Sequence, residues 1–359
     1  MATSIPASQA RAQFTQACID VFTDAIQPTS FLRSFFPSDQ SFTRYVSIQV
    51  MRNYELVATD VLRNTQGNRN NFAKSTEKVF DPAYYREYID MTEIDLYDRL
   101  FGSSAIDSGV FTQLTQEVSR RLVGMRNKIE RTHEKNCAEA LISGTVTFTN
   151  ATSVDFGRNS RSLIANGAGI TWATGTVDPF ANIGGWCDLL RGYGKVEGYN
   201  MNLLMGSTAH SDLFNNTIFK SRVTQNLNNS IDNIVPVQRN SVGGAFHGTL
   251  TCGSYRVNLW TYPQSYDVSG TPTAYLDAKK VVLLPENPRF KLAFAAVPQL
   301  LGSNGGIEPL SGVSPMAAQP FVVGNYTDPI NSAHIMDIKS AGMPILTAVD
   351  QVITAAPVA

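Results

Sequence analysis

The chain has 359 residues, of which 43% are hydrophobic and 16% are charged, and its 29 basic residues almost balance its 30 acidic ones. This length and hydrophobic content are enough for one large domain or for two domains with a real core. The charged fraction lies below the roughly 25% that is usual in soluble proteins. A surface with few charges and almost no net charge tends to associate with other protein surfaces. The near-zero net charge also argues against nucleic-acid binding driven by the charge of the whole chain.

The cysteines and the apolar runs bear on where the chain is found. No apolar run reaches the roughly 18 residues that a membrane span needs, and residues 1–10 lack the pattern of a signal peptide. We therefore expect no contact with a membrane and a cytoplasmic location at synthesis. Widely spaced cysteines without a C-x-x-C pair predict free buried thiols and no zinc site: Cys18, Cys137, Cys187 and Cys252.

The first part of the chain predicts an arm and a projecting hairpin. Residues 8–26 have the apolar spacing of a short amphipathic helix, and Pro28 ends it. The aromatic run 31–36 is too short to form a core by itself, so we expect it to pack against another surface. Residues 41–76 are expected to form a long hairpin, with a strand that includes 45–50 and a loop tip rich in Asn and Gly. Such a hairpin has little core of its own and needs a partner surface.

The most distinctive prediction is one long amphipathic helix over residues 111–143. Its apolar residues recur mostly every three or four positions, Ser108 is a suitable N-cap, and Gly144 follows its end. At 1.5 Å per residue such a helix is about 50 Å long. Periodicity alone favours a core helix with a polar face. The alternative is a spine that braces an elongated subunit, because a compact domain of this size does not need so long a helix.

The second half predicts a separate α/β lobe followed by a return to strands. Helices and strands alternate from about residue 178 to 287. The predicted helices cover 180–192 and 208–223, and the predicted strands of this lobe cover 201–205, 255–262 and 275–284. From Arg289 onward the strand candidates are 321–323, 334–338 and 344–353.

The sequence contains no catalytic motif that would carry an activity, and we expect no metal and no cofactor. The four histidines lie in four different segments: His133, His210, His247 and His334. His210 is followed by a serine and an aspartate, but adjacent residues rarely form a catalytic triad. His133 is expected to be a solvated or packing residue. A hydrolase that uses His210 or His334 stays the alternative of a different class.

The long helix also carries basic side chains with two interpretations. They could face nucleic acid; the candidates are Arg120, Arg121, Arg126 and Arg131. The favoured alternative is a solvated helix face on which these side chains pair with Glu117, Glu130 and Glu134.

Several short segments, in order along nearly the whole chain, resemble the major capsid proteins of lambda-like phages, the major capsid protein E family. They are an F-L-R-x-F-F box at 31–36, an F-x-P-x-Y segment at 80–84, a V-D-x-G-R box at 154–158, Trp172 spaced before Asp178 and Pro179, and the closing segment with Asp328, 338–343 and Asp350. The resemblance implies an α+β chain with the Hong Kong 97 phage capsid fold.

That fold implies five segments in this chain. Residues 1–38 would be an N-terminal arm and 39–78 an extended hairpin loop. Residues 79–158 would form the first part of a peripheral domain with the spine helix at 111–143. Residues 159–287 would form an axial domain, and 288–359 would supply the return strands of the peripheral domain.

The resemblance further implies a structural, non-enzymatic function. Copies of the chain would self-assemble into pentamers and hexamers of the icosahedral head of a tailed phage, around double-stranded DNA and with scaffold, portal and decoration proteins. Maturation would rearrange the subunits as rigid bodies while the spine helix and hairpin bend. The assembly-interface candidates are Phe31, Arg33, Phe35, Phe36, Tyr45, Arg69 and Phe72. An encapsulin-like compartment shell is the alternative with the same fold.

Overall fold

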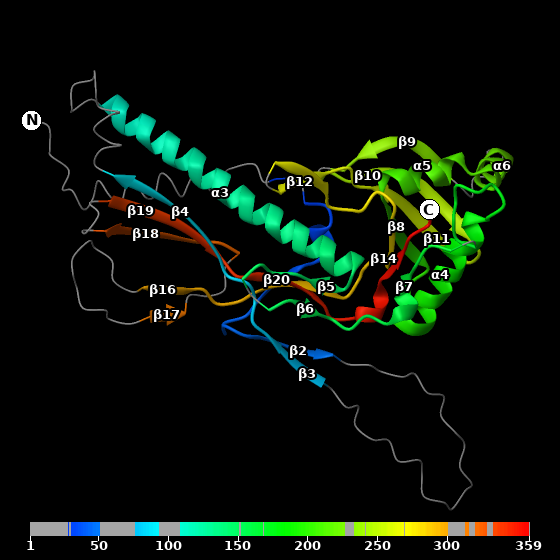
Figure 1. Ribbon diagram of the computed structural model, residues 1–359, viewed down its shortest axis with the longest axis horizontal. Helices are drawn as coiled ribbons and strands as arrows, with labels where there is room; N and C mark the ends of the chain where they lie inside the picture. Colours follow the sequence, from blue (N-terminus) through cyan, green and yellow to red (C-terminus); the bar gives the residue numbers. More distant parts are fainter. Residues whose placement is uncertain are drawn as a thin grey trace, which may run out of the picture.

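One long helix, α3 (Ser108–Ile142), runs through the molecule and joins a set of small sheets at one end to a mixed α/β lobe at the other (Figure 1). The structure is a computed structural model. It describes residues 28, 30–50, 76–92, 108–150, 152–167, 169–226, 233–240, 242–268, 270–300, 313–315, 320–328 and 333–358.

Helix α3 confirms the predicted long helix and begins three residues earlier than expected, at Ser108. The first and second halves of its apolar stripe pack into two different hydrophobic cores. Val118, Leu122 and Ile129 are buried against a three-stranded sheet, whereas Cys137 and Leu141 belong to a central core. The helix is therefore both a core helix and a spine, because different stretches of one stripe pack on different parts of the molecule.

Two three-stranded sheets form the peripheral part. In the first, β4 (Tyr85–Thr92), β19 (Ala333–Ser340) and β18 (Val322–Asp328) are antiparallel, with β19 in the middle. In the second, β15 (Phe290–Phe294) lies between β20 (Gly342–Leu346) and the short β1 (Ser38–Gln40), which runs parallel to it. Both sheets combine strands from the beginning and the end of the chain. The 3-10 turn η1 (Arg33–Phe35) precedes β1.

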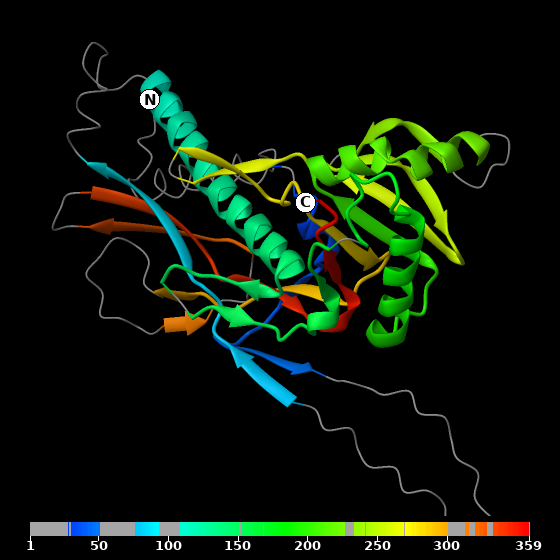
Figure 2. The same cartoon turned by 45° about the vertical axis from the view of Figure 1, so that its right-hand side comes forward.

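The predicted projecting hairpin begins as a pair of antiparallel strands, β2 (Val46–Val50) and β3 (Thr76–Phe80). Figures 1 and 2 show this strand pair at the edge of the body, with β2 leading away from it and β3 returning to it. The predicted tip lies outside the described residues, as does the predicted helix at 8–26. Two further strand pairs are β5 (Thr145–Val146) with β6 (Val154–Asp155) and β16 (Pro298–Leu300) with β17 (Val313–Pro315).

The α/β lobe is built on a seven-stranded mixed sheet in the order β7-β21-β14-β8-β11-β10-β9. The strands are β7 (Leu163–Ile164), β8 (Asn200–Met205), β9 (Asn233–Arg239), β10 (Ala245–Cys252), β11 (Tyr255–Thr261), β14 (Val281–Pro285) and β21 (Ile353–Ala355). Its helices are α4 (Pro179–Gly194), α5 (Ser207–Asn215) and α6 (Thr217–Asn226), and the hairpin β12 (Ser265–Val268) and β13 (Thr271–Ala274) extends from it. The short 3-10 turns η2 (Ser160–Ser162) and η3 (Val349–Gln351) complete the elements.

Three predictions need correction. The helix expected over 208–223 is two helices, because Asn216 breaks it and accepts hydrogen bonds from the N–H groups of Ile218 and Phe219. The strand expected over 275–284 begins only at Val281. The C-terminal segment was assigned wholly to the peripheral domain, yet β21 pairs with β14 and β7 in the sheet of the lobe, where its apolar residues are buried.

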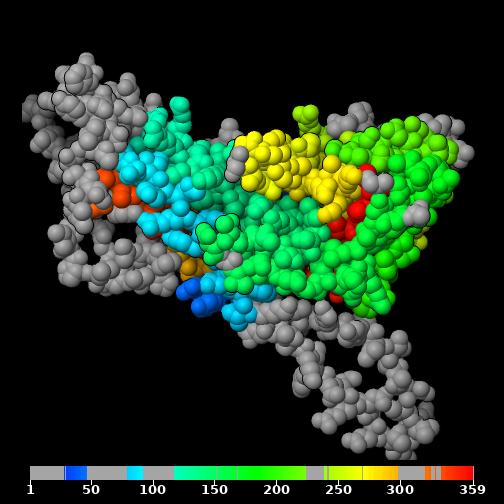
Figure 3. All heavy atoms as spheres, viewed as in Figure 1, coloured from blue at the N-terminus to red at the C-terminus, as the bar shows by residue number. Residues whose placement is uncertain are grey.

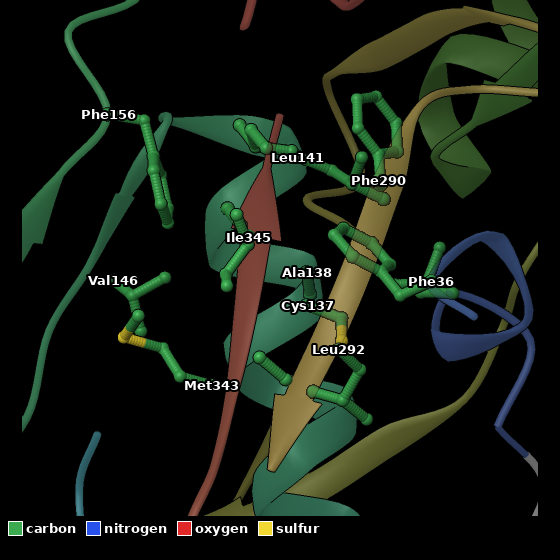
Figure 4. Packing of buried hydrophobic residues seen from close by; sticks show 14 of the residues in the cluster. Phe36, Cys137, Ala138, Leu141, Val146, Phe156, Phe290, Leu292, Met343 and Ile345 are labelled. Carbon is green, nitrogen blue, oxygen red and sulfur yellow. The ribbon is translucent and has the colours of Figure 1, made fainter. Parts of the chain in front are cut away.

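The central core connects these parts. Figure 4 shows Cys137, Ala138 and Leu141 of α3 facing Leu292 and Phe290 of β15 and Met343 and Ile345 of β20. Residues from the beginning of the described chain, such as Phe36, complete the same cluster. The spine, the sheet of β15 and β20 and the start of the described chain are thus held by one continuous apolar cluster.

Candidate assembly surfaces and joints

The aromatic run at 31–36 is mostly buried inside its own subunit. Phe31 is 3% exposed and lies against Trp260 and Tyr262, with ring centroids 5.3 and 5.6 Å away. Phe36 is 2% exposed and stacks on Phe290 at 5.3 Å (Figure 4). The prediction that these two side chains contact a neighbouring subunit is therefore wrong, because aromatic partners of the same subunit already cover them.

The other two interface candidates in this run, Arg33 and Phe35, differ from each other. Phe35 is half-buried and meets Phe31 edge-to-face at 5.4 Å, so part of its ring stays accessible. Arg33 is largely buried and forms an ion pair with Glu130 of α3. The sequence placed Arg33 at a subunit interface, but the structure uses it to fix the start of the described chain on the spine helix.

A buried glutamate completes this attachment. The two carboxylate oxygens of Glu134 accept the N–H groups of Leu32 and Arg33 over 2.8 and 2.9 Å, and Tyr262 also hydrogen bonds to it. Burial raises the pKa of Glu134, while these hydrogen bonds act in the opposite direction. The helix face with Glu130 and Glu134 was expected to be solvated. Both are buried instead, because the turn at Arg33–Phe35 packs over them.

The basic residues of α3 divide into two groups. Arg120, Arg121 and Arg131 are exposed, and Arg121 pairs with Glu117 over 2.9 Å as the favoured interpretation predicted. Arg126 is only 8% exposed, and its guanidinium lies over the ring of Phe321 at 5.4 Å. The prediction that Arg126 faces DNA is therefore wrong, since an apolar ring and the body of the subunit cover its charged end.

Arg158 connects the spine helix to the lobe by hydrogen bonds. The sequence alone did not predict this role. Its guanidinium donates to the carbonyls of Leu141 and Ile142 at the end of α3 and to Val352 beside β21. Further bonds reach the Ser162 carbonyl and the Thr354 hydroxyl. Burial lowers the pKa of Arg158 to about 10. The V-D-x-G-R resemblance marked the residue, but only the fold brings these five acceptors together.

Gly144 makes room for this joint. Its φ of +75° lies in the left-handed region that favours glycine. A Cβ at this position would overlap the Cδ atom of Arg158. The glycine therefore ends the spine helix and also lets the arginine side chain pass close to the backbone.

The hairpin root exposes apolar and aromatic side chains. Phe42 is 72% exposed, Tyr45 is 49% exposed and Val79 is 60% exposed. Arg44 lies over the Tyr45 ring at 5.2 Å and pairs with Asp81 across the root of the hairpin at 2.9 Å. Tyr45 is thus on the surface, as an interface residue needs to be. Arg69 and Phe72 lie outside the described residues and stay predictions.

The structure places His133 in the core and brings His210 beside His247. His133 is fully buried, hydrogen bonds to Ser340 at 3.0 Å and lies edge-on to Tyr85 and Phe294, so it is a packing residue. His210 lies against the ring of His247 at 4.2 Å. Among the described residues, no three His, Cys, Asp or Glu side chains are placed to hold a metal ion.

The chain matches the model of the phage major capsid protein E family over residues 15–356. It belongs to this family. The structure of a prophage capsid protein from E. coli CFT073 is similar, with 16% identity, full coverage of both chains and a TM-score of 0.59. A phage-related protein from Bordetella bronchiseptica RB50 is also similar, with 9% identity, 95% and 96% coverage and a TM-score of 0.50. No curated protein matches the chain in sequence.

These similarities confirm the predicted Hong Kong 97 phage capsid fold and the predicted function as a major capsid protein of the phage head shell. The family match decides between the two interpretations that share the fold, in favour of the phage shell over the encapsulin-like compartment. Within the described residues of this capsid protein, no helix is long and apolar enough to cross a membrane.

Proposed function

We propose that copies of this chain assemble as pentamers and hexamers into the icosahedral head of a tailed phage that encloses double-stranded DNA. The observation that most directly supports this proposal is the match to the family over residues 15–356. The shape of the subunit supports the proposal: a long spine, a hairpin that points away from the body, and exposed aromatic side chains at its root (Figure 1). Side chains of this kind are commonly covered by partner subunits.

The proposed role of the chain is structural and not enzymatic. Each subunit makes several contacts at once, so individually weak contacts give a stable shell. The hairpin lies over a neighbouring subunit, with Tyr45, Arg69 and Phe72 as its proposed contact residues, and Phe35 of the arm is a further proposed contact residue. Scaffold, portal and decoration proteins are the proposed further partners. The subunits are made in the host cytoplasm and end in the virion.

The packaged DNA is proposed to meet the shell without base recognition. Arg120, Arg121 and Arg131 are exposed on α3 and can approach phosphate groups. The almost neutral chain and the pairing of Arg121 with Glu117 keep this contact weak. A weak inner contact suits a genome that must leave the head again.

The test is assembly of the purified chain. We expect closed shells, or pentamers and hexamers, in negative-stain electron microscopy and in size-exclusion chromatography. If a scaffold is needed, these forms appear when the neighbouring phage genes are co-expressed. A chain that stays monomeric even then contradicts the proposal.

A further inference from the structure

Two histidine rings meet in the α/β lobe, and the proposed shell function gives them no role. His210 belongs to α5 and His247 to β10, and their ring centroids are 4.2 Å apart with planes inclined by 43°. The ring of Phe214 lies 4.5 Å from His210 and 6.1 Å from His247. Figure 1 shows α5 and β10 in the same part of the lobe, and in Figure 3 light green residues from this part of the chain form its surface. The pair therefore joins a helix to the sheet near the surface of the lobe.

An irregularity in β10 lies where His247 meets the helix. The pairings of β10 with β9 and with β11 both shift register between Phe246 and Gly248, so His247 is the additional residue of a β-bulge. Gly248 has a φ of +130°, a conformation that favours glycine. The Nε2 atom of His247 hydrogen bonds to the Thr261 hydroxyl at 2.8 Å. The bulge and this hydrogen bond together fix the ring beside His210.

The surroundings of the pair favour uncharged rings. The Nε2 atom of His210 is buried, and in the described part of the chain it has no hydrogen-bond partner. His210 also lies in the first turn of α5, where the positive end of the helix dipole disfavours a cation. Burial and, after it, the charge of His247 lower the pKa of His210 to about 4. Burial lowers the pKa of His247 as well.

Carboxylates do not balance a charge on this pair, because none is among the causes that shift the two pKa values. Among the described residues of the elements packed around the pair, the acidic side chains are Asp188, Asp212 and Asp277. Asp188 of α4 accepts the Tyr255 hydroxyl at 2.8 Å, and Asp277 pairs with Lys280 at 3.6 Å in the turn before β14. Asp212 lies on α5 itself. The other charges on α4, α6, β9 and β11 and in this turn are cations, which cannot stabilise an imidazolium: Arg191, Lys220, Arg222, Arg239, Arg256 and Lys279.

We propose that this pair is an acid-sensitive clamp: the neutral rings hold α5 on β10, and their protonation releases α5 from the sheet while the rest of the lobe stays folded. Two imidazolium ions repel each other strongly at this distance when no counter-charge is near. Both rings are half-buried, so a movement of α5 is enough to expose them, whereas the fully buried His133 becomes exposed only when the core unfolds. The proposal concerns the single subunit and does not rest on the shell function.

The direction of the effect follows from the lowered pKa of His210. When α5 is released, the pKa of His210 returns to about 6.5, against about 4 in the closed clamp. The clamp is therefore complete above pH 6.5 and weakens as the pH falls toward 4. Between pH 6.5 and pH 5, His210 alone shifts the opening equilibrium up to about thirtyfold, since each pH unit is worth a factor of about ten.

The first test is amide hydrogen exchange of unassembled, full-length subunits at pH 7 and pH 5, corrected for the intrinsic effect of pH on exchange. In the wild type we expect the protection of the α5 amides to fall at least about tenfold at pH 5, while β14 in the same sheet stays protected. His210→Phe keeps a ring against Phe214 but cannot bind a proton, so its α5 amides are expected to stay protected. His334→Phe is the matched control, because His334 is half-buried in β19, outside the lobe. It is expected to behave like the wild type.

Three results would overturn the clamp in this experiment. One is an equal loss of α5 protection in the wild type and in His210→Phe, and another is no loss in the wild type. The third is a loss that spreads equally to β14, because acid would then unfold the lobe as a whole.

The second test does not depend on a folded variant at position 210. The histidine ring protons are titrated by NMR in the wild type and in His247→Gln, whose amide can keep a hydrogen bond to Thr261. We expect the pKa of His210 to rise in the variant, because the neighbouring charge is removed, and the pKa of His334 to stay the same. An unchanged pKa of His210 would show that the two rings do not act on each other, and the clamp would be refuted.

Discussion

Single buried polar residues hold the parts of this subunit together, and Arg158 is the clearest example. Its five hydrogen bonds join the end of α3 to η2 and β21. A guanidinium reaches so many acceptors because its donors form a planar fork, whereas a lysine ammonium is one compact charge. The orientation of the lobe relative to the spine therefore depends on this side chain.

Arg158→Lys is expected to lower the free energy of unfolding of the subunit by about 3 kcal/mol, because several buried carbonyls lose their donor. The measurement is urea unfolding of unassembled subunits. Arg161→Lys is the control, since Arg161 is exposed and lies over Tyr193 at 4.8 Å. Equal losses in the two variants would show that the joint does not depend on the arginine fork.

His133 links stability to pH. Burial lowers its pKa from 6.5 to about 3, so the folded subunit keeps the imidazole neutral while the unfolded chain binds a proton below pH 6.5. Its stabilising contribution is complete above pH 6.5 and falls as the pH decreases toward 3. Each pH unit in that window removes up to about 1.4 kcal/mol.

The check is the pH dependence of unfolding for the wild type and His133→Asn. We expect the wild type to lose about 2 kcal/mol more than the variant between pH 6.5 and pH 5. The difference between the two proteins isolates His133 from other groups, such as Glu134, whose raised pKa makes the stability depend on pH with the opposite sign. Parallel pH profiles would mean that His133 is protonated in the folded subunit.

At the scale of elements, one glycine inside α3 and one just beyond its end carry opposite expectations. Gly124 is exposed within the helix, and a Cβ there would meet no atom within 4 Å. Gly124→Ala is expected to stabilise the subunit by about 0.5–1 kcal/mol through helix propensity. Gly144→Ala is expected to destabilise it by more than that, because of its positive φ and the Arg158 side chain.

Thermal unfolding of both variants measures the contrast. The same substitution should raise the melting temperature at position 124, inside the helix, and lower it at position 144, just beyond its end. A stabilised Gly144→Ala variant would mean that Arg158 can leave its position at little cost.

Elements with a strong local signal could be predicted, and those fixed by distant contacts could not. The apolar stripe of α3 predicted its length to within a few residues. The break at Asn216 escaped prediction because the apolar spacing continues through it, and its side chain donates to the carbonyls of Trp172 and Val177 only in the fold. β21 escaped assignment to the lobe because its partners lie far away in the sequence.

At the candidate assembly surfaces, too, contacts between residues far apart in the sequence escaped prediction. The aromatic composition of the run at 31–36 predicts that another surface covers it, and the resemblance to capsid proteins suggests a second subunit as that surface. Trp260, Tyr262 and Phe290 supply it within the subunit, and no local pattern relates them to Phe31 or Phe36. An acidic pair spaced four apart on a helix, Glu130 and Glu134, was the one sequence signal that could have indicated the anchor of Arg33.

At the scale of the whole molecule, the near balance of charge has a structural counterpart. Many charges are paired within the subunit, for example Lys128 with Glu87 and Lys291 with Asp39. The apolar surface at the hairpin root is the feature that distinguishes this molecule from an ordinary soluble monomer, and it lies where the hairpin leaves the body.

The position of β21 in the sheet has a consequence for synthesis. β7 pairs with β21 in the described structure, and β21 also lies next to β14. About 190 residues separate β7 from its partner strand, so at the roughly 5–20 residues per second of a ribosome β7 waits for tens of seconds. Two hydrogen-bond acceptors of Arg158, the Val352 carbonyl and the Thr354 hydroxyl, are synthesised equally late. A chain in which β21 has not yet been made therefore lacks a finished lobe.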